Sequence, residues 1–126
     1  RFGEQELGFA APLAAPQSLA EFSAQLGERL GRELVCVPGD GRALRRVAWC
    51  TGGAQGYFEA AIAAGADVFV TGEISEPQAH YARETGVAFV AAGHHATERY
   101  GVQALARHLA GEFALTQQFI DIPNPA

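Results

Sequence analysis

Two nearly continuous apolar runs most limit what this chain can fold into. They are ADVFV at 66–70 and VAFVAA at 87–92, and each is followed by a glycine and then by a segment of helical character. Short apolar runs that alternate with helices are typical of parallel strands buried on both faces of a sheet. The pattern therefore predicts an α/β fold built around a mostly parallel, mixed sheet.

The other segments extend this pattern to one module over residues 1–126. Residues 1–17 are rich in Gly, Ala and Pro and are predicted to be an extended lead-in that can pair elsewhere as a strand. Ser18 and Glu21 form a capping-box pattern, and Gly31 is a helix end. The expected order is α-β-(β-α)3-β, with helices over 18–31, 54–65, 75–86 and 96–113 and further strands over 32–39, 45–53 and 115–122.

Composition excludes several classes of function. The net charge is -5 with only nine Lys and Arg among 126 residues, which argues against a nucleic-acid partner because phosphate binding needs clustered basic residues. No apolar run approaches the roughly 20 residues of a membrane helix, and no signal-peptide pattern is present. Cys36 and Cys50 lack further cysteine partners and are expected to be free thiols in a reducing compartment, so we expect a cytoplasmic protein.

Three short polar sequences follow the predicted strands: TGGAQ at 51–55, TGEISE at 71–76 and GHHATE at 93–98. In open α/β sheets, ligands bind outside the carboxyl ends of the strands. Because these ends meet at one edge of a parallel sheet, we expect the three loops to lie together and to form a site.

The third loop carries side chains that can bind a metal ion. His94 and Glu98 are four residues apart, so they can meet across the first turn of a helix. An imidazole and a carboxylate suit zinc, iron or manganese better than calcium, but a tightly bound metal needs three or four donors. The alternative is that His94 and His95 are turn residues and that Thr97 or Glu98 caps the helix. The residues alone leave both interpretations open.

The first two loops carry weaker signals. Gly52 and Gly53 let backbone amides approach an anion, although a tight turn without a ligand explains the same pattern. Glu73 directly follows a strand, where it can act as a base or hold another site residue. An acidic residue before a helix is also favoured by the helix dipole alone.

Four long motifs resemble the bacterial dinuclear metal-centre family, whose members carry the name GTP cyclohydrolase 1 type 2 homologues. The motifs are RVAWCTGGAQ, ADVFVTGEISE, AAGHHATERYGVQALARHL and the terminal FIDIPNPA, in that order. The resemblance runs from about Leu13 to Ala126. It implies that this chain is the second of two similar α/β repeats, with the first repeat expected before Arg1.

The resemblance also implies roles for individual residues. Two divalent metal ions are expected between the repeats, and the pattern G-H-x-x-T-E identifies His94 and Glu98 as the ligands that this repeat donates. A histidine pair and an aspartate of the first repeat would supply the remaining ligands. Gly52, Gly53, Glu73 and His95 are then expected to contact a substrate, and Glu73 to shuttle protons. Members of this family assemble as hexameric rings.

Two functions follow from these expectations. The first is a metal-dependent hydrolase that acts on a small molecule, either a nucleotide or a phosphate ester. The second is a ring-forming metal-binding scaffold or regulatory protein without catalytic activity. Nothing in the residues selects guanine as a substrate, and a metal-free binding module is a third option for this chain by itself.

Overall fold

The computed structural model describes residues 1–126 and contains a five-stranded mixed sheet. The strands are β1 (Phe9–Gln17), β2 (Val35–Val37), β3 (Leu44–Trp49), β4 (Val68–Thr71) and β5 (Ala88–Ala91). Their order across the sheet is β1-β3-β4-β5-β2. The three central strands are parallel, whereas β1 and β2 pair antiparallel at the two edges. The predicted α/β class with parallel strands in a mixed sheet is therefore confirmed.

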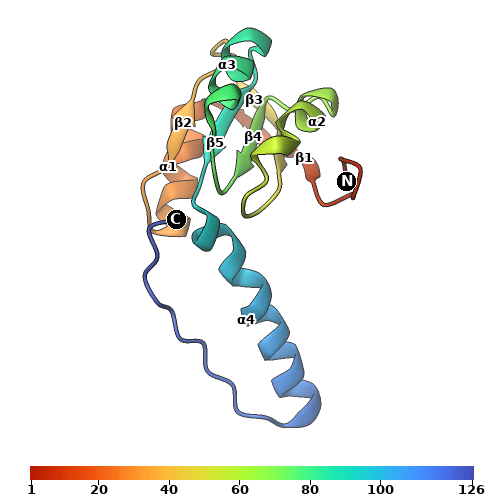
Figure 1. Cartoon of the computed structure of the whole chain (residues 1–126), viewed down its shortest axis with the longest axis vertical. Coiled ribbons are helices and arrows are strands. Elements are labelled where there is room, and N and C mark those ends of the chain that lie inside the picture. Colours follow the sequence, from red (N-terminus) through yellow and green to blue (C-terminus); the bar gives the residue numbers. More distant parts are fainter.

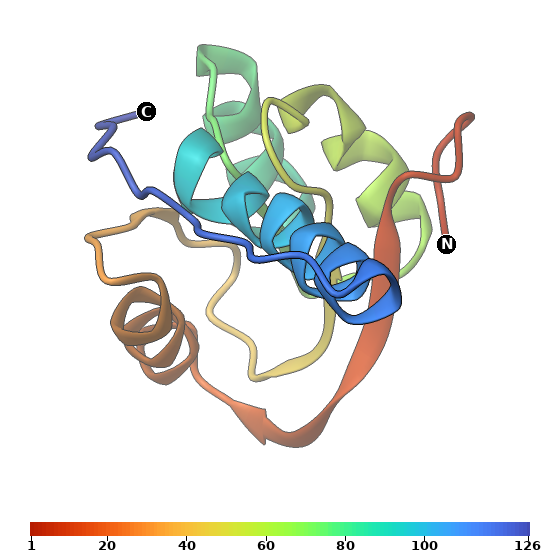
Figure 2. The ribbon, with the colours of Figure 1, turned by 90° about the horizontal axis from the view of Figure 1, so that it is seen from below.

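Helices cover both faces of this sheet. They are α1 (Leu19–Leu30), α2 (Phe58–Ala63), preceded by a 3-10 turn at Gln55–Tyr57, α3 (Glu76–Thr85) and α4 (His94–Phe113). Figures 1 and 2 show α1 on one face and α2 and α3 on the other. This arrangement is the layered packing that the alternation of apolar runs and helices predicted.

The predicted capping residues begin and end α1. The Ser18 hydroxyl accepts a hydrogen bond from the Glu21 amide at 3.2 Å, and the Ser18 amide donates to the Glu21 carboxylate at 2.8 Å. Gly31 then ends the helix in the left-handed conformation, with φ of 69°. These bonds satisfy amide groups that the first turn of a helix would otherwise leave without partners.

The central strands place alternate residues against the two helical layers. On one face, the rings of Phe69 and Phe89 pack against Phe58 of α2, with centroid separations of 5.8 Å and 4.9 Å respectively. On the other face, Val68, Val70 and Val90 belong to a cluster that α1 covers through its leucines and Phe22. The apolar runs are thus buried on both faces, as parallel central strands require.

Helix α4 leaves the sheet, and the last residues of the chain return along it (Figure 1). Ala96 is the buried residue of this helix. The predicted strand over 115–122 is wrong, because residues 115–126 form no regular element. This segment pairs with neither of the two edge strands, β1 and β2. Its end is held by Arg32, which donates to the carbonyls of Ala126 at 3.1 Å and Pro125 at 3.3 Å.

Two expectations from composition can also be compared with the structure. Cys36 and Cys50 are free thiols, as predicted, and Cys50 is buried. None of the helices combines the length and apolar composition needed to cross a membrane.

The aromatic cluster makes a prediction about stability. Phe89 is fully buried between Phe58 and Phe69, so Phe89→Ala removes a ring and leaves a cavity. We expect the free energy of unfolding in urea to fall by roughly 3–5 kcal/mol. Leu7→Ala is the control, because Leu7 is 54% exposed and its truncation should change stability by no more than about 0.5 kcal/mol. Equal effects of the two substitutions would contradict this assignment of the core.

Candidate metal-binding corner

The loops that follow β3, β4 and β5 are joined by backbone hydrogen bonds. The Gly72 amide donates to the Gly52 carbonyl at 2.8 Å, and the Gly93 amide donates to the Gly72 carbonyl at 2.9 Å. The predicted convergence of the three loops at one sheet edge is therefore confirmed. We call this region, residues 50–54, 72–75 and 92–98, the glycine corner.

Two threonine side chains reinforce the corner. The buried Thr71 hydroxyl donates to the Gly52 carbonyl at 3.1 Å and accepts from the Ala54 amide at 3.2 Å. The Thr97 hydroxyl accepts from the Gly52 amide at 3.0 Å and donates to the Gly93 carbonyl at 2.9 Å. Sequence reasoning considered Thr97 only as a helix cap and overlooked Thr71. Thr51-Gly52 and Thr71-Gly72 each follow a predicted strand, and this repeated Thr-Gly pair could have indicated a role for Thr71.

Two positions in the corner must be glycine, because atoms of the neighbouring loops lie where a side chain would begin. A Cβ on Gly72 would lie 2.6 Å from both the Gly52 carbonyl oxygen and the His94 Cα. Gly52 has φ of 70°, and its Cβ would press against Glu98 Oε1 and lie 3.2 Å from His94 Nε2. Gly72 thus lets the loops touch, and Gly52 lets the Glu98 carboxylate and the imidazole pack against the first loop.

His94 lies between two carboxylates. Its Nδ1 is 2.5 Å from Glu73 Oε1, and its Nε2 is 3.0 Å from Glu98 Oε2. Helix α4 begins at His94 rather than near Ala96, after Gly93 with φ of 92°. His94 and Glu98 consequently meet across the first turn, as their spacing predicted. Both side chains are partly exposed.

The contact between His94 and Glu73 shifts the pKa of each partner. The hydrogen bond to Glu73 raises the pKa of His94, with a further contribution from the negative charge of Glu98. The same hydrogen bond lowers the pKa of Glu73. The pair therefore stabilises the fold while His94 is protonated and Glu73 is ionised. That contribution is lost as the pH rises through the raised pKa of His94, and also as it falls through the lowered pKa of Glu73.

The corner fits one part of a metal site. His94 and Glu98 contact each other through Nε2 and Oε2 at 3.0 Å, and both line one surface hollow of about 480 Å³. No group of three or more His, Cys, Asp or Glu side chains is arranged to hold a metal ion. The donor set matches zinc, iron or manganese in kind but falls short in number. The metal role of His94 and Glu98 therefore stays a prediction.

The other predicted site residues lie around this pair. Gly53 is next to Glu73, since its Cβ would be 3.4 Å from Glu73 Oε1. His95 faces the returning chain end, where its Nε2 is 3.3 Å from Asp121 Oδ1. Gln55 was overlooked by sequence reasoning; its amide donates to Glu73 Oε2 at 3.4 Å. The structure thus brings Gly52, Gly53 and Glu73 to His94, whereas the imidazole of His95 is occupied elsewhere.

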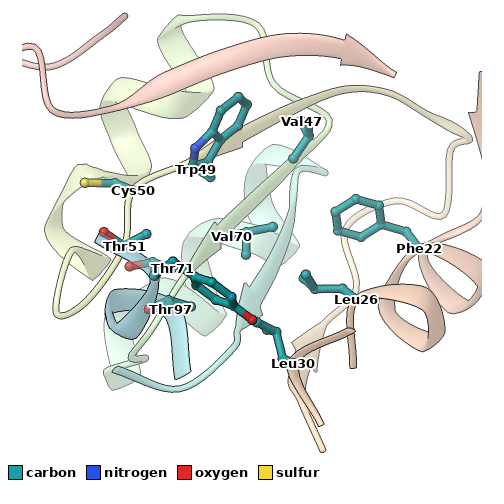
Figure 3. A pocket seen from close by; sticks show the side chains of 11 residues that line it. Phe22, Leu26, Leu30, Val47, Trp49, Cys50, Thr51, Val70, Thr71 and Thr97 are labelled. Atoms are coloured by element: carbon teal, nitrogen blue, oxygen red, sulfur yellow. The ribbon is translucent and has the colours of Figure 1, made fainter. Parts of the chain in front are cut away.

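An apolar pocket of about 400 Å³ adjoins the corner. Figure 3 shows Thr71 and Thr97 at one end of it and Phe22, Leu26 and Leu30 of α1 at the other. The hydroxyls of Thr71 and Thr97 are already used within the corner. The pocket therefore offers few free polar groups, and a nucleotide base would lose hydrogen bonds to water there without replacing them.

The close approach at Gly72 makes a testable prediction. Gly72→Ala should separate the three loops and lower the free energy of unfolding by roughly 1–3 kcal/mol, as overpacking does. Gly56→Ala is the matched control, because a Cβ at Gly56 meets nothing within 4 Å. Urea unfolding measures both, and NMR chemical shifts of His94 report on the corner. A neutral Gly72→Ala would show that the loops do not need this contact.

Known proteins resemble this chain in sequence and in structure. It is 57% identical over 114 residues to the GTP cyclohydrolase 1 type 2 homolog of Pseudomonas aeruginosa. This match covers 90% of this chain and 45% of that protein. It is also 51% identical over 126 residues to the homolog of the same name from Neisseria meningitidis serogroup B. That match covers all of this chain and 51% of the Neisseria protein. The chain spans about half the length of these curated relatives.

A solved structure and a family model agree with these relatives. The structure of protein ybgI, whose function is described as unknown, superimposes with a TM-score of 0.91 at 45% identity. The superposition covers 95% of this chain and 49% of that one. The family model of Duf34/NIF3 (NGG1p interacting factor 3) matches residues 2–125. With the fold, the glycine corner and these matches in agreement, the chain belongs to the Duf34/NIF3 family.

Proposed function

We propose that this chain is the ligand-donating half of a dinuclear metal centre in a longer protein with two similar repeats. The observation that carries the proposal is the contact of His94 Nε2 with Glu98 at 3.0 Å, beside a surface hollow that both side chains line. Two donors that converge but fall short of a complete set are what one half of a divided site presents. A histidine pair and an aspartate of the other repeat are the proposed remaining ligands.

The exposed surface of α4 supports a companion body at this place. From His94 and Glu98, steps of three or four residues along the helix lead to apolar residues, which places them on the same face. These residues are 39–66% exposed: Val102, Leu105, Leu109 and Phe113. An apolar stripe of this length on a helix marks a surface that packs against another body. A body that covers the stripe would meet His94 and Glu98 at its end.

The proposed cofactors are two divalent ions of zinc, iron or manganese, held here by His94 and Glu98. Such ions supply Lewis acidity to hydrolysis when they are bound. The proposed substrate is a small molecule, either a nucleotide or a phosphate ester, in contact with Gly52, Gly53, Glu73 and His95. The relatives' name refers to GTP cyclohydrolase, which agrees with a nucleotide. A homo-oligomer, a hexameric ring in the longer protein, completes the proposal.

Metal content tests the assignment of ligands. In the longer protein, Glu98→Gln removes a negative charge that offsets the two cations but keeps the shape of the side chain, so metal content should fall sharply. His95→Ala is the matched control and should leave metal content largely unchanged, because His95 faces Asp121. Elemental analysis after dialysis measures both. Loss of metal in His95→Ala but not in His94→Ala would reverse the assignment.

The 126-residue chain alone provides a second comparison. With only half of the donors, it should retain little metal after the same dialysis, because each missing ligand removes binding free energy. Stoichiometric metal on this chain would refute the divided site.

Turnover distinguishes a hydrolase from a scaffold. A panel of nucleotides and phosphate esters is incubated with the longer protein, either loaded with zinc, iron or manganese or stripped of metal. We expect at least one substrate to be hydrolysed only by the loaded form. A loaded protein with no turnover above the stripped control would favour a metal-stabilised scaffold or regulatory protein.

A further inference from the structure

We propose that Glu73 is a positioning residue that holds neutral His94 as the Nδ1–H tautomer and thereby leaves the Nε2 lone pair on the side of Glu98, beside the surface hollow that His94 and Glu98 both line. This inference deepens the proposed function, on which its consequence for metal binding rests. The tautomer itself is a property of the chain without metal. Glu73 would then hold the ring of a metal ligand, in addition to the substrate contact proposed for it above.

The geometry around the ring distinguishes its two nitrogens. A neutral imidazole has one N–H donor and one acceptor nitrogen, so only one of the two neighbouring carboxylates can accept its hydrogen bond. The contact from Nδ1 to Glu73 is 2.5 Å, and the contact from Nε2 to Glu98 is 3.0 Å. On the basis of the shorter contact, we assign the proton of the neutral ring to Nδ1. The tautomer of a histidine is set by the hydrogen bond that its other nitrogen makes.

Glu73 and His94 belong to different elements of the fold. It lies in the loop after β4, whereas Glu98 lies one turn further along the helix of His94 itself. The Gln55 amide donates to Glu73 Oε2 at 3.4 Å and to the Ser75 hydroxyl at 3.3 Å. Gln78 in turn donates to the Gln55 carbonyl at 3.2 Å. The sheet loops therefore fix one side of the imidazole, whereas Glu98 contacts the other side from the helix that it shares with His94.

His94 and Glu98 both line a surface hollow of about 480 Å³. A Cβ on Gly52 would press against Glu98 Oε1 and lie 3.2 Å from His94 Nε2, whereas a Cβ on Gly53 would make ordinary contacts of 3.4 Å to Glu73 and 3.5 Å to His94 Cε1. A carboxylate that holds the far nitrogen of a metal-binding histidine fixes the ring and raises its basicity. Glu73 occupies that position, and Glu98 occupies the position of a second ligand.

Long-range ¹H–¹⁵N NMR of the metal-free chain, at a pH where His94 is neutral, tests the tautomer. In the unmodified chain and in Glu73→Gln, whose amide oxygen still accepts a hydrogen bond, we expect mainly Nδ1–H. In Glu73→Leu the proton should move mainly to Nε2, where Glu98 accepts it. Glu76→Leu, an exposed change in the first turn of α3, is the control and should keep Nδ1–H. An Nε2–H tautomer in the unmodified chain, or no change in Glu73→Leu, would overturn the inference.

Metal affinity of the longer protein tests the consequence. Glu73→Leu should weaken the binding of Zn²⁺ by about 10–100-fold, as loss of such a partner does, and Glu73→Gln should restore most of the affinity. Unchanged Zn²⁺ affinity in Glu73→Leu would refute the positioning role. If the unmodified longer protein binds no metal while the NMR result is as expected, the proposed function fails but the tautomer assignment is confirmed.

Discussion

The candidate site depends on backbone hydrogen bonds that continue across the sheet after its strands have ended. Beyond β4, the Gly72 amide still reaches the Gly52 carbonyl, and beyond β5 the Gly93 amide reaches the Gly72 carbonyl. Loops can approach this closely only where no side chain intervenes, as the contacts of a Cβ at Gly72 show. Because α4 begins directly after Gly93, the sheet itself fixes the position of His94. Loops placed by a rigid sheet are where binding residues concentrate in proteins.

Local patterns in the sequence were sufficient for most of the elements and for the contact between His94 and Glu98. The apolar runs marked β4 and β5, and the Ser18 capping box marked α1, because burial and capping act over a few residues. The convergence of the three loops followed from parallel topology alone. The meeting of His94 with Glu98 followed from helix geometry, although the helix begins two residues earlier than predicted.

Contacts between distant segments could not be predicted in the same way. Glu73 and His94 are 21 residues apart, and their contact depends on how two loops lie after the sheet has formed. The alternating residues at 115–122 indicated a strand, yet a strand also needs a partner with free backbone groups. In this structure the segment pairs with neither β1 nor β2, so its β-propensity remains unused. Sequence patterns report the secondary structure that a segment prefers, and contacts with the rest of the fold determine whether that structure forms.

Helix α4 links the proposed metal site to the proposed companion repeat. The proposed ligand residues, His94 and Glu98, are followed along the helix by the exposed apolar stripe that ends at Phe113. A body that buries this stripe gains about 25 cal/mol for each Å² of apolar surface removed from water. The same body would bring donors to the open side of His94 Nε2, so that docking assembles the metal site. Metal that binds only the docked state must then stabilise docking, and the stabilisation increases with the metal concentration. In the proposed function, the exposed stripe and the incomplete donor set therefore have one common cause, which is the division of the site between two repeats.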